Sequence, residues 1–193
     1  MNQVAKPSGA SGAPVASGTA ANAVGEAQAV WSLLRMAVGD EVVAVGIEDV
    51  REILQVTRMT PLPRTPDFVR GVMNLRGAVV PVVDLSARLG RAPSVLGRRS
   101  CIVVVECHPA QPEDEEQPVA AATVMGLLVD SVFEVFDRNA SEIESAPSLG
   151  TRIDTNFLRG MTRAGGQLIG VLALSRLLAT QELAAGIADF QPH

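Results

Sequence analysis

The feature that most constrains the fold of this chain is an internal repeat, in which two stretches of twenty-two residues align without a gap. Phe68–Leu89 reads FVRGVMNLRGAVVPVVDLSARL, and Phe157–Leu178 reads FLRGMTRAGGQLIGVLALSRLL. Eight positions, at a constant offset of 89 residues, are identical: Phe68/Phe157, Arg70/Arg159, Gly71/Gly160, Gly77/Gly166, Val82/Val171, Leu85/Leu174, Ser86/Ser175 and Leu89/Leu178. We therefore predict two diverged copies of one module, at about residues 31–90 and 100–178.

The residues of both copies favour strands. Short runs of Val, Ile and Leu, separated by Gly, Pro and Asp, are typical of an all-β chain. Strands are predicted at 31–38, 41–47, 53–59, 72–75, 78–84, 100–106, 120–130, 132–137, 158–163 and 167–174, and short helices at 66–70, 85–90 and 175–182. One module alone is too small to bury a large core. The two copies are therefore predicted to pack together as two small β-barrels.

Positions that are kept in both copies are predicted to serve the fold, and positions that differ are candidates for function. Gly77 and Gly166 fall where a hairpin turns, and are predicted to supply positive φ angles. Arg76 precedes the first of them, whereas Gly165 holds the corresponding place in the second copy. An ion pair with Glu52 would orient the Arg76 guanidinium for a partner. The alternative is an ordinary surface pair of little energy.

Two further residues of the first copy carry a prediction. Asp84 stands where the second copy has Ala173, and is interpreted as the cap of a helix that begins at Leu85 or Ser86 rather than as an acid–base group. Pro81 interrupts a predicted strand, which indicates an edge strand or a bulge. Another protein's strand could pair with such an edge.

The sequence contains few groups that could perform catalysis. His108 and His193 are its only histidines, and no Ser–His–Asp or Cys–His arrangement can be assembled on rigid elements from them. Cys101, Cys107 and His108 make a poor zinc set, because a fourth ligand and the usual CxxC spacing are missing. We therefore predict no enzymatic activity, no metal and no cofactor.

The distribution of charge bears on the class of partner. The 193 residues carry a net charge of −5 with one Trp, five Phe and no Tyr, which argues against a nucleic-acid-binding protein. Residues 51–99 contain nine Arg and three acidic residues, a net charge of +6, so the rest of the chain carries −11. The basic stretch is either a surface for a protein partner or a solvated face in a chain with a general preference for Arg.

The ends of the chain and one internal segment are predicted to lie outside the folded domain. Residues 1–30 are rich in Ala, Gly and Ser and read as a flexible tail without an export signal, and residues 183–193 as a C-terminal tail. Residues 108–118 are acidic and proline-rich, which predicts an exposed loop between two strands. Cys101 and Cys107 lie about 20 Å apart along a predicted strand. They cannot form a disulfide, so they indicate a reducing cytoplasm.

The stretch Pro63–Leu85, which reads PRTPDFVRGVMNLRGAVVPVVDL, resembles the signature of CheW-type chemotaxis coupling proteins. The similarity extends to the turn at Gly39–Glu41 and to the segments at Val50–Ile53 and Val129–Val135, and covers about residues 31–182. The resemblance implies two intertwined five-stranded SH3-like barrels.

The function that the resemblance implies is that of a cytoplasmic adaptor between chemoreceptors, the methyl-accepting chemotaxis proteins, and the regulatory domain of a chemotaxis histidine kinase. Other CheW-like proteins are possible further partners, and neither nucleic acid nor direct membrane insertion is implied. By position, Val50, Glu52, Gly71 and Arg76 match residues implicated in receptor or kinase binding. Val50 would be an apolar anchor, and Arg76 a polar partner oriented by Glu52.

Two other functions compete with this one. The chain could be a detached regulatory domain that competes with a kinase, although no phosphotransfer helix, ATP-binding lobe or receiver module accompanies it. It could also be a β-barrel nucleic-acid binder, which the acidic balance and scarce aromatic residues oppose. The resemblance does not specify the signalling pathway, because swimming chemotaxis, twitching motility and surface sensing all use such adaptors.

Overall fold

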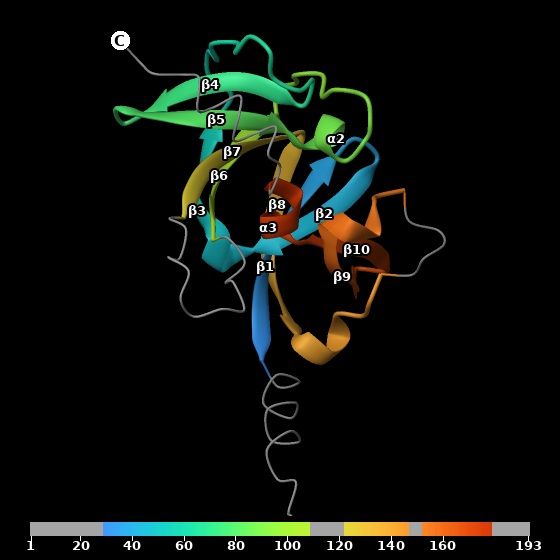
Figure 1. Ribbon diagram of the computed structural model, residues 1–193. Helices are drawn as coiled ribbons and strands as arrows, with labels where there is room; N and C mark the ends of the chain where they lie inside the picture. Colours follow the sequence, from blue (N-terminus) through green and yellow to red (C-terminus); the bar gives the residue numbers. More distant parts are fainter. Residues whose placement is uncertain (1–28, 109–121, 147–151, 179–193) are drawn as a thin grey trace, which may run out of the picture.

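The computed structural model describes residues 29–108, 122–146 and 152–178, which form two five-stranded β-sheets with a few short helices (Figure 1). This arrangement confirms the predicted all-β class. The predicted tails and the predicted acidic loop fall almost entirely on residues 1–28, 109–121 and 179–193. These lie outside the described residues, so the tails and the loop stay predictions.

The two copies of the repeat each contain five strands followed by a short α-helix, and differ in where their 3-10 helices lie. The first comprises β1 (Val30–Val38), β2 (Glu41–Gly46), η1 (Ile47–Asp49), β3 (Val50–Gln55), β4 (Val69–Leu75), β5 (Ala78–Asp84) and α2 (Leu85–Arg88). The second comprises β6 (Cys101–Cys107), β7 (Thr123–Val129), β8 (Ser131–Asn139), η2 (Ala140–Glu142), η3 (Thr155–Phe157), β9 (Leu158–Ala164), β10 (Gln167–Leu172) and α3 (Leu174–Leu178). The 89-residue offset thus relates β4 to β9 and β5 to β10.

The two copies exchange strands. One sheet has the order β8-β1-β2-β10-β9 and the other β3-β6-β7-β5-β4, so each sheet takes two strands from one copy and three from the other. Four pairings join the copies: β1 with β8 and β3 with β6 are antiparallel, and β2 with β10 and β5 with β7 are parallel. The sequence copies at 31–90 and 100–178 are therefore units of the repeat, but neither copy forms a sheet by itself.

The main cluster of the hydrophobic core unites the two sheets, and each sheet has a smaller cluster of its own. The main cluster contains buried side chains of both, among them Met36 and Val45 from one sheet and Val103 and Leu127 from the other. Leu177 of α3 is fully buried in the same cluster. Each strand exchange thus places the apolar face of one copy against the other, which gives two small modules the common core that neither could build alone.

Arg88 of α2 links the two copies near their junction. Its guanidinium lies over the rings of both Phe68 and Phe157, at 4.9 and 4.5 Å from the ring centroids. Its Nε donates a hydrogen bond to the Leu177 carbonyl at 2.7 Å. Phe68 and Phe157 are repeat equivalents, and Leu177 is the equivalent of Arg88 itself. The Arg88 guanidinium thus contacts equivalent aromatic residues of both copies.

Two local predictions are wrong. Residues 66–70 do not form a helix: Val69 N–H donates to the Pro66 carbonyl in a turn, and β4 begins at once. Pairing of β4 with β5 outweighs the local preference for a helix after Pro66. Of the two alternatives for Pro81, the edge strand is wrong, because β5 lies between β4 and β7, whereas the ladder of β4 with β5 does contain a register shift, opposite Val82 and Val83. Pro81 is tolerated there since the ladder with β7 runs only from Val82 to Asp84.

Both cysteines are free thiols at the two ends of β6. Burial, followed by the negative charges of Asp49 and Glu106, raises the pKa of Cys107 to about 12. Burial also raises the pKa of Cys101 above its ordinary value. The thiol forms therefore dominate at neutral pH in the folded protein.

This protection predicts the reactivity of Cys107. In the native protein at pH 8, an alkylating reagent should leave Cys107 unmodified, and in denaturant both cysteines should react fully. Because the folded pKa lies above the unfolded value near 9, stability should fall as the pH rises from about 9 to about 12. Mass spectrometry of alkylated peptides checks the first result and urea titrations the second. Rapid native labelling of Cys107 would contradict its burial.

Candidate protein-binding site

The turn between β4 and β5 holds an arginine in an unfavourable backbone conformation. Arg76 and Gly77 have φ angles of 53° and 91°, the pattern of a two-residue hairpin turn that favours glycine. Gly77 N–H donates to Asn74 Oδ1 at 2.9 Å, which closes the turn. The second copy places Gly165 at the same point, with φ of 57°. The left-handed region costs a non-glycine residue roughly 1–2 kcal/mol, so the Arg76 side chain is kept at the expense of stability.

The Arg76 side chain forms the predicted ion pair. Its Nη2 lies 2.9 Å from Glu52 Oε2, with the arginine side chain 80% exposed and the glutamate 24% exposed. Glu52 belongs to β3 and Arg76 follows β4, which are the two outer strands of one sheet. The pair therefore joins the two edges of that sheet, and confirms the Arg76–Glu52 contact expected from the sequence.

Gly71 lies where the chain that follows β3 crosses β4. Thr60 and Val72 exchange two backbone hydrogen bonds, of 2.8 and 2.9 Å, and a β-bulge between Val69 and Gly71 bends β4 at that point. Gly71 is buried, has a φ of +129°, and a Cβ there would lie 2.2 Å from the Thr60 carbonyl oxygen. The structure thus gives Gly71 a role in folding, and a direct role in partner binding stays a prediction.

Val50 is half-buried at the start of β3 and packs against the main core cluster. A register shift between Val50 and Glu52 in the ladder with β6 is followed by Ile53, which is 45% exposed. Ile53 is not among the predicted site residues. The alternation of apolar and polar residues along β3 could have identified it as an outward apolar side chain. Val50 and Glu52 therefore lie together on β3, beside an exposed apolar residue.

The corresponding strand of the second copy, β8, carries an equivalent carboxylate with a different partner. Glu134 corresponds to Glu52, but its Oε1 lies 3.3 Å from Nη2 of Arg35 on the adjacent strand β1. The Arg35 guanidinium also lies 4.8 Å from the centroid of the Phe133 ring. The carboxylate is thus common to both copies, whereas the exposed arginine at a hairpin tip belongs to the first copy alone.

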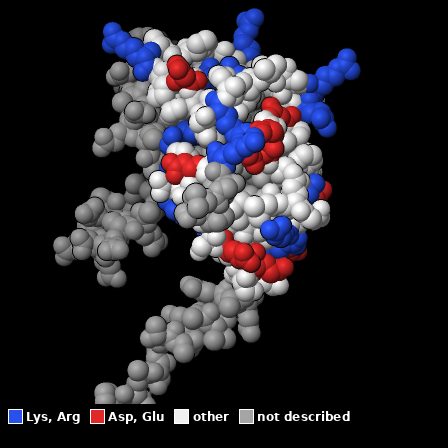
Figure 2. Space-filling model, turned by 90° about the vertical axis from the view of Figure 1, so that its right-hand side faces the viewer, with Lys and Arg blue, Asp and Glu red and all other residues white. Residues whose placement is uncertain are grey.

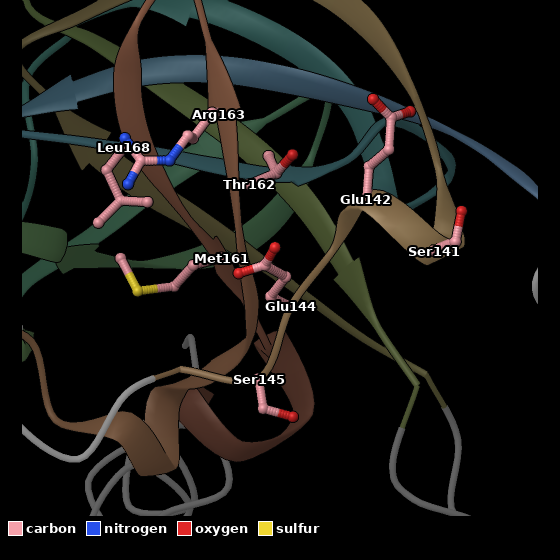
Figure 3. Close-up of a pocket in the computed structure, with 8 residues that line it drawn as sticks. All are labelled: Ser141, Glu142, Glu144, Ser145, Met161, Thr162, Arg163 and Leu168. Atoms are coloured by element: carbon pink, nitrogen blue, oxygen red, sulfur yellow. The ribbon is translucent and has the colours of Figure 1, made fainter.

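A recess of about 410 Å³ beside β9 contains none of the predicted site residues (Figure 3). Glu142 and Glu144 line one side of it, and Arg163 and Leu168 the other. Across the described residues, no three His, Cys, Asp or Glu side chains are grouped so as to hold a metal ion. No helix within the described ranges is long and apolar enough to cross a membrane.

Comparisons with known proteins agree with this fold. The family model described as "CheW-like domain" matches residues 32–182. The chemotaxis protein CheW of Rhizobium meliloti is 34% identical over 150 residues, which cover 78% of this chain and 88% of that protein. Protein FrzA of Myxococcus xanthus is 33% identical over 145 residues, which cover 74% and 82%.

A solved structure shares the same architecture. The scaffolding protein TtCheW of Thermoanaerobacter tengcongensis matches with a TM-score of 0.66 and 29% identity, over 80% of this chain and 96% of that one. Both barrels are thus of the SH3-like type expected from the repeat and the resemblance. The match of the family model to most of the chain, together with the two intertwined sheets, shows that this chain belongs to the CheW family of chemotaxis adaptor proteins.

Proposed function

We propose that the chain is a non-enzymatic adaptor that couples chemoreceptors to a chemotaxis-type histidine kinase in the cytoplasm. The family is shown by the comparisons, and its members include proteins named for chemotaxis and for scaffolding. The proposed partners are receptor cytoplasmic tips, the regulatory domain of the kinase and other CheW-like proteins. The adaptor would join the membrane-bound receptor array through these partners alone.

The observation that carries the proposal is the Arg76–Glu52 pair. Arg76 occupies a turn position at which glycine is more stable, and 80% of its side chain is exposed. A surface ion pair contributes at most about 1 kcal/mol, which does not offset the strain of the left-handed conformation. Selection for stability therefore does not account for this arginine, whereas recognition of a partner carboxylate or carbonyl does.

Gly165 supports the same conclusion from the second copy. There the hairpin has the same turn geometry with glycine at the position of Arg76. Both hairpins fold, so the fold itself does not require arginine at this place. Val50 and Glu52 on β3 would supply the apolar and polar remainder of the same surface, with Glu52 holding the guanidinium in place.

Substitution of Arg76 should separate binding from stability. Arg76→Glu should abolish capture of the receptor signalling domain or of the kinase with little change in the thermal midpoint. Arg76→Gly should also lose capture, but should raise stability by about 1 kcal/mol, because glycine relieves the left-handed strain. Pull-downs with purified receptor signalling domains and kinase from the same organism measure the first effect, and urea titrations the second.

The matched control is Gly165→Arg, which places a guanidinium on the other hairpin and should leave capture unchanged. The double variant Arg76→Glu with Glu52→Arg exchanges the two charges. It should re-form the ion pair and keep the stability of the wild type, but it should not bind a partner that recognises a positive charge at position 76. A wild-type protein that captures neither partner would refute the coupling role. A large loss of stability in Arg76→Glu would instead make Arg76 a structural residue.

A further inference from the structure

One buried position differs between the two copies although its backbone is the same. Asp84 N–H donates to the Phe68 carbonyl at 2.7 Å, and Ala173 N–H, at the equivalent place, donates to the Phe157 carbonyl at 2.8 Å. The side chains of Asp84 and Ala173 are both buried. The second copy therefore keeps the position and its hydrogen bond but lacks the carboxylate.

The arginine that pairs with Asp84 is kept in both copies. Each copy places it as the extra residue of a β-bulge, since the ladder of β4 with β5 passes over Arg70 and the ladder of β9 with β10 passes over Arg159. A bulge re-aims the side chain of its extra residue. Arg70 Nε lies 3.0 Å from Asp84 Oδ2, whereas the second copy has an alanine at the place of that acid.

Arg159 forms no ion pair with any of the described residues. Its guanidinium lies 3.6 Å from the centroid of the Trp31 ring, a contact that orients the planar group. Figure 2 shows that an arginine alone is ordinary in itself, because some basic side chains at the top of that face project without acidic neighbours. Arg159 is a special case because its equivalent, Arg70, binds a carboxylate through the same bulge.

A recess of about 300 Å³ lies beside Ala173, at the lower end of the size range of small-molecule sites. Its polar lining comes from β9, α3, η1 and the residue that follows β6, and consists of Arg159, Ser175, Arg176, Asp49 and His108. Ser86, the equivalent of Ser175, donates to the Ala92 carbonyl at 2.8 Å. By contrast, the side chains of Arg159, Ser175 and Arg176 donate no hydrogen bond to any of the described residues.

Asp49 is the one acid among the described residues that line the recess. Burial and the adjacent Glu48 raise its pKa above the ordinary value, while the charges of His108 and Arg159 act in the opposite direction. Asp49 is thus near enough to Arg159 to interact through its charge without forming an ion pair. Glu48 is exposed and does not line the recess. Because two arginines line it with one acid, the lining carries a net positive charge.

We propose that the recess binds the carboxylate of a small organic acid, in the place that the Asp84 side chain holds in the first copy. A guanidinium offers two parallel N–H donors to a carboxylate, and the Ser175 hydroxyl lines the same recess as a further donor. A carboxylate is the expected group because the same bulge and the same backbone hold one in the first copy. The recess has room for a few carbon atoms as well, so a short dicarboxylate such as succinate fits it.

This inference does not rest on the proposed coupling function. Arg159 belongs to β9 in one sheet, whereas Arg76 and Glu52 join the two edges of the other sheet. Binding of an acid is measured on the purified chain alone, without receptor or kinase. Failure of this proposal and failure of the coupling role are therefore separate results.

Titration of the isotope-labelled full chain with acetate and with succinate, followed in amide NMR spectra, tests the proposal. Sodium chloride at the same ionic strength is the reference, because it screens charges without supplying a carboxylate. The amide signals of Arg159, Ala173 and Ser175 should shift and reach saturation. Arg159→Leu should weaken binding at least about tenfold, since a charge-assisted hydrogen bond is lost. Arg163→Leu, on the same strand but outside the recess, is the matched control and should bind like the wild type.

Ala173→Asp supplies the missing carboxylate from the chain itself. It should abolish binding of both acids and keep the thermal midpoint at or above the wild-type value, because the new side chain pairs with Arg159 as Asp84 pairs with Arg70. Ala173→Asn fills the same space without the charge. It should therefore unfold at a lower temperature than Ala173→Asp.

The proposal is overturned if neither acid produces saturable shifts, if chloride produces the same shifts, or if Ala173→Asp binds the acids like the wild type. Residues 113–116 are all acidic. Binding that appears only after their replacement by glutamine would identify that segment, and not a free acid, as the occupant. If the wild type binds no acid but Ala173→Asp loses capture of receptor or kinase, the recess takes an acidic side chain of that partner and the free-acid proposal is wrong.

Discussion

Gly71→Ala should destabilise the protein by about 3–5 kcal/mol, the largest effect expected from replacing any glycine of the described residues with alanine. A φ angle of +129° lies in a region that only glycine adopts readily and costs an alanine about 1–3 kcal/mol, and the new Cβ would lie 2.2 Å from the Thr60 carbonyl oxygen. Relief of that overlap requires movement of backbone, because Thr60 and Val72 are joined by two hydrogen bonds. Overpacking of this kind typically costs a further 1–3 kcal/mol, and sometimes more. Urea titration measures the loss.

Gly77→Ala is the control that separates the cost of the backbone conformation from the cost of the steric overlap in Gly71→Ala. Gly77 also has a positive φ, of +91°, but a Cβ there would meet nothing within 4 Å. Its replacement should therefore cost only about 1–2 kcal/mol. If both variants lose the same stability, the crossing at Thr60 is not the constraint that the structure describes. A Gly71→Ala protein that folds like the wild type yet fails to capture receptor or kinase would instead place Gly71 in the binding surface.

Asp84→Ala should cost about 3–5 kcal/mol, because it leaves the Arg70 guanidinium without its buried partner. The Asp84 side chain is fully buried, and Arg70 is only 31% exposed. Asp84 also accepts from Ala87 N–H at 3.2 Å, which caps α2, and from Ser94. A thermal or urea unfolding curve of the variant checks the loss. If the free energy of unfolding of Asp84→Ala lies within about 1 kcal/mol of the wild-type value, the Arg70 guanidinium is hydrated in the variant and does not need the Asp84 carboxylate.

The double variant Asp84→Ala with Arg70→Leu is the control for that interpretation. Removal of both charges leaves no unpaired ion, so the double variant should recover part of the stability that Asp84→Ala loses. The second copy illustrates the alternative solution. Ala173 replaces Asp84 there, and Arg159, the equivalent of Arg70, is exposed and lies 3.6 Å from the centroid of the Trp31 ring.

Several features followed from the sequence because they depend on neighbouring residues. The turns at Gly77 and Gly166 require positive φ whatever surrounds them, and Asp84 caps the helix that begins one residue later. The Arg76–Glu52 pair could be predicted because Arg76 holds a turn position that Gly165 holds in the second copy, and because Glu52 was the nearest carboxylate expected from the order of the elements. The helix predicted at 66–70 failed for the opposite reason, since pairing with a distant strand decided the conformation of that segment.

The candidate site was predicted only in outline. Glu52 and Arg76 are brought together as expected, at the two edges of one sheet. Burial alternates strictly along β3, so Ile53 lies on the outward face with Arg51 and Gln55. The alternation itself could be followed in the sequence. Which of the two faces turns outward was decided by the pairing of β3 with β6 and the packing of the sheet.

By itself, the sequence determined the repeat, the all-β class and the turns, because each of these is encoded in short-range patterns of residues. Only the tertiary structure decided that the copies exchange strands, with β1 and β2 pairing with the second copy and β6 and β7 with the first. It also decided that Asp84 is buried with Arg70 and that the loop at Val95 is held in solvent. Strand pairing is set by hydrogen bonds between segments far apart in the chain, and neither periodicity nor spacing specifies which strand is the partner.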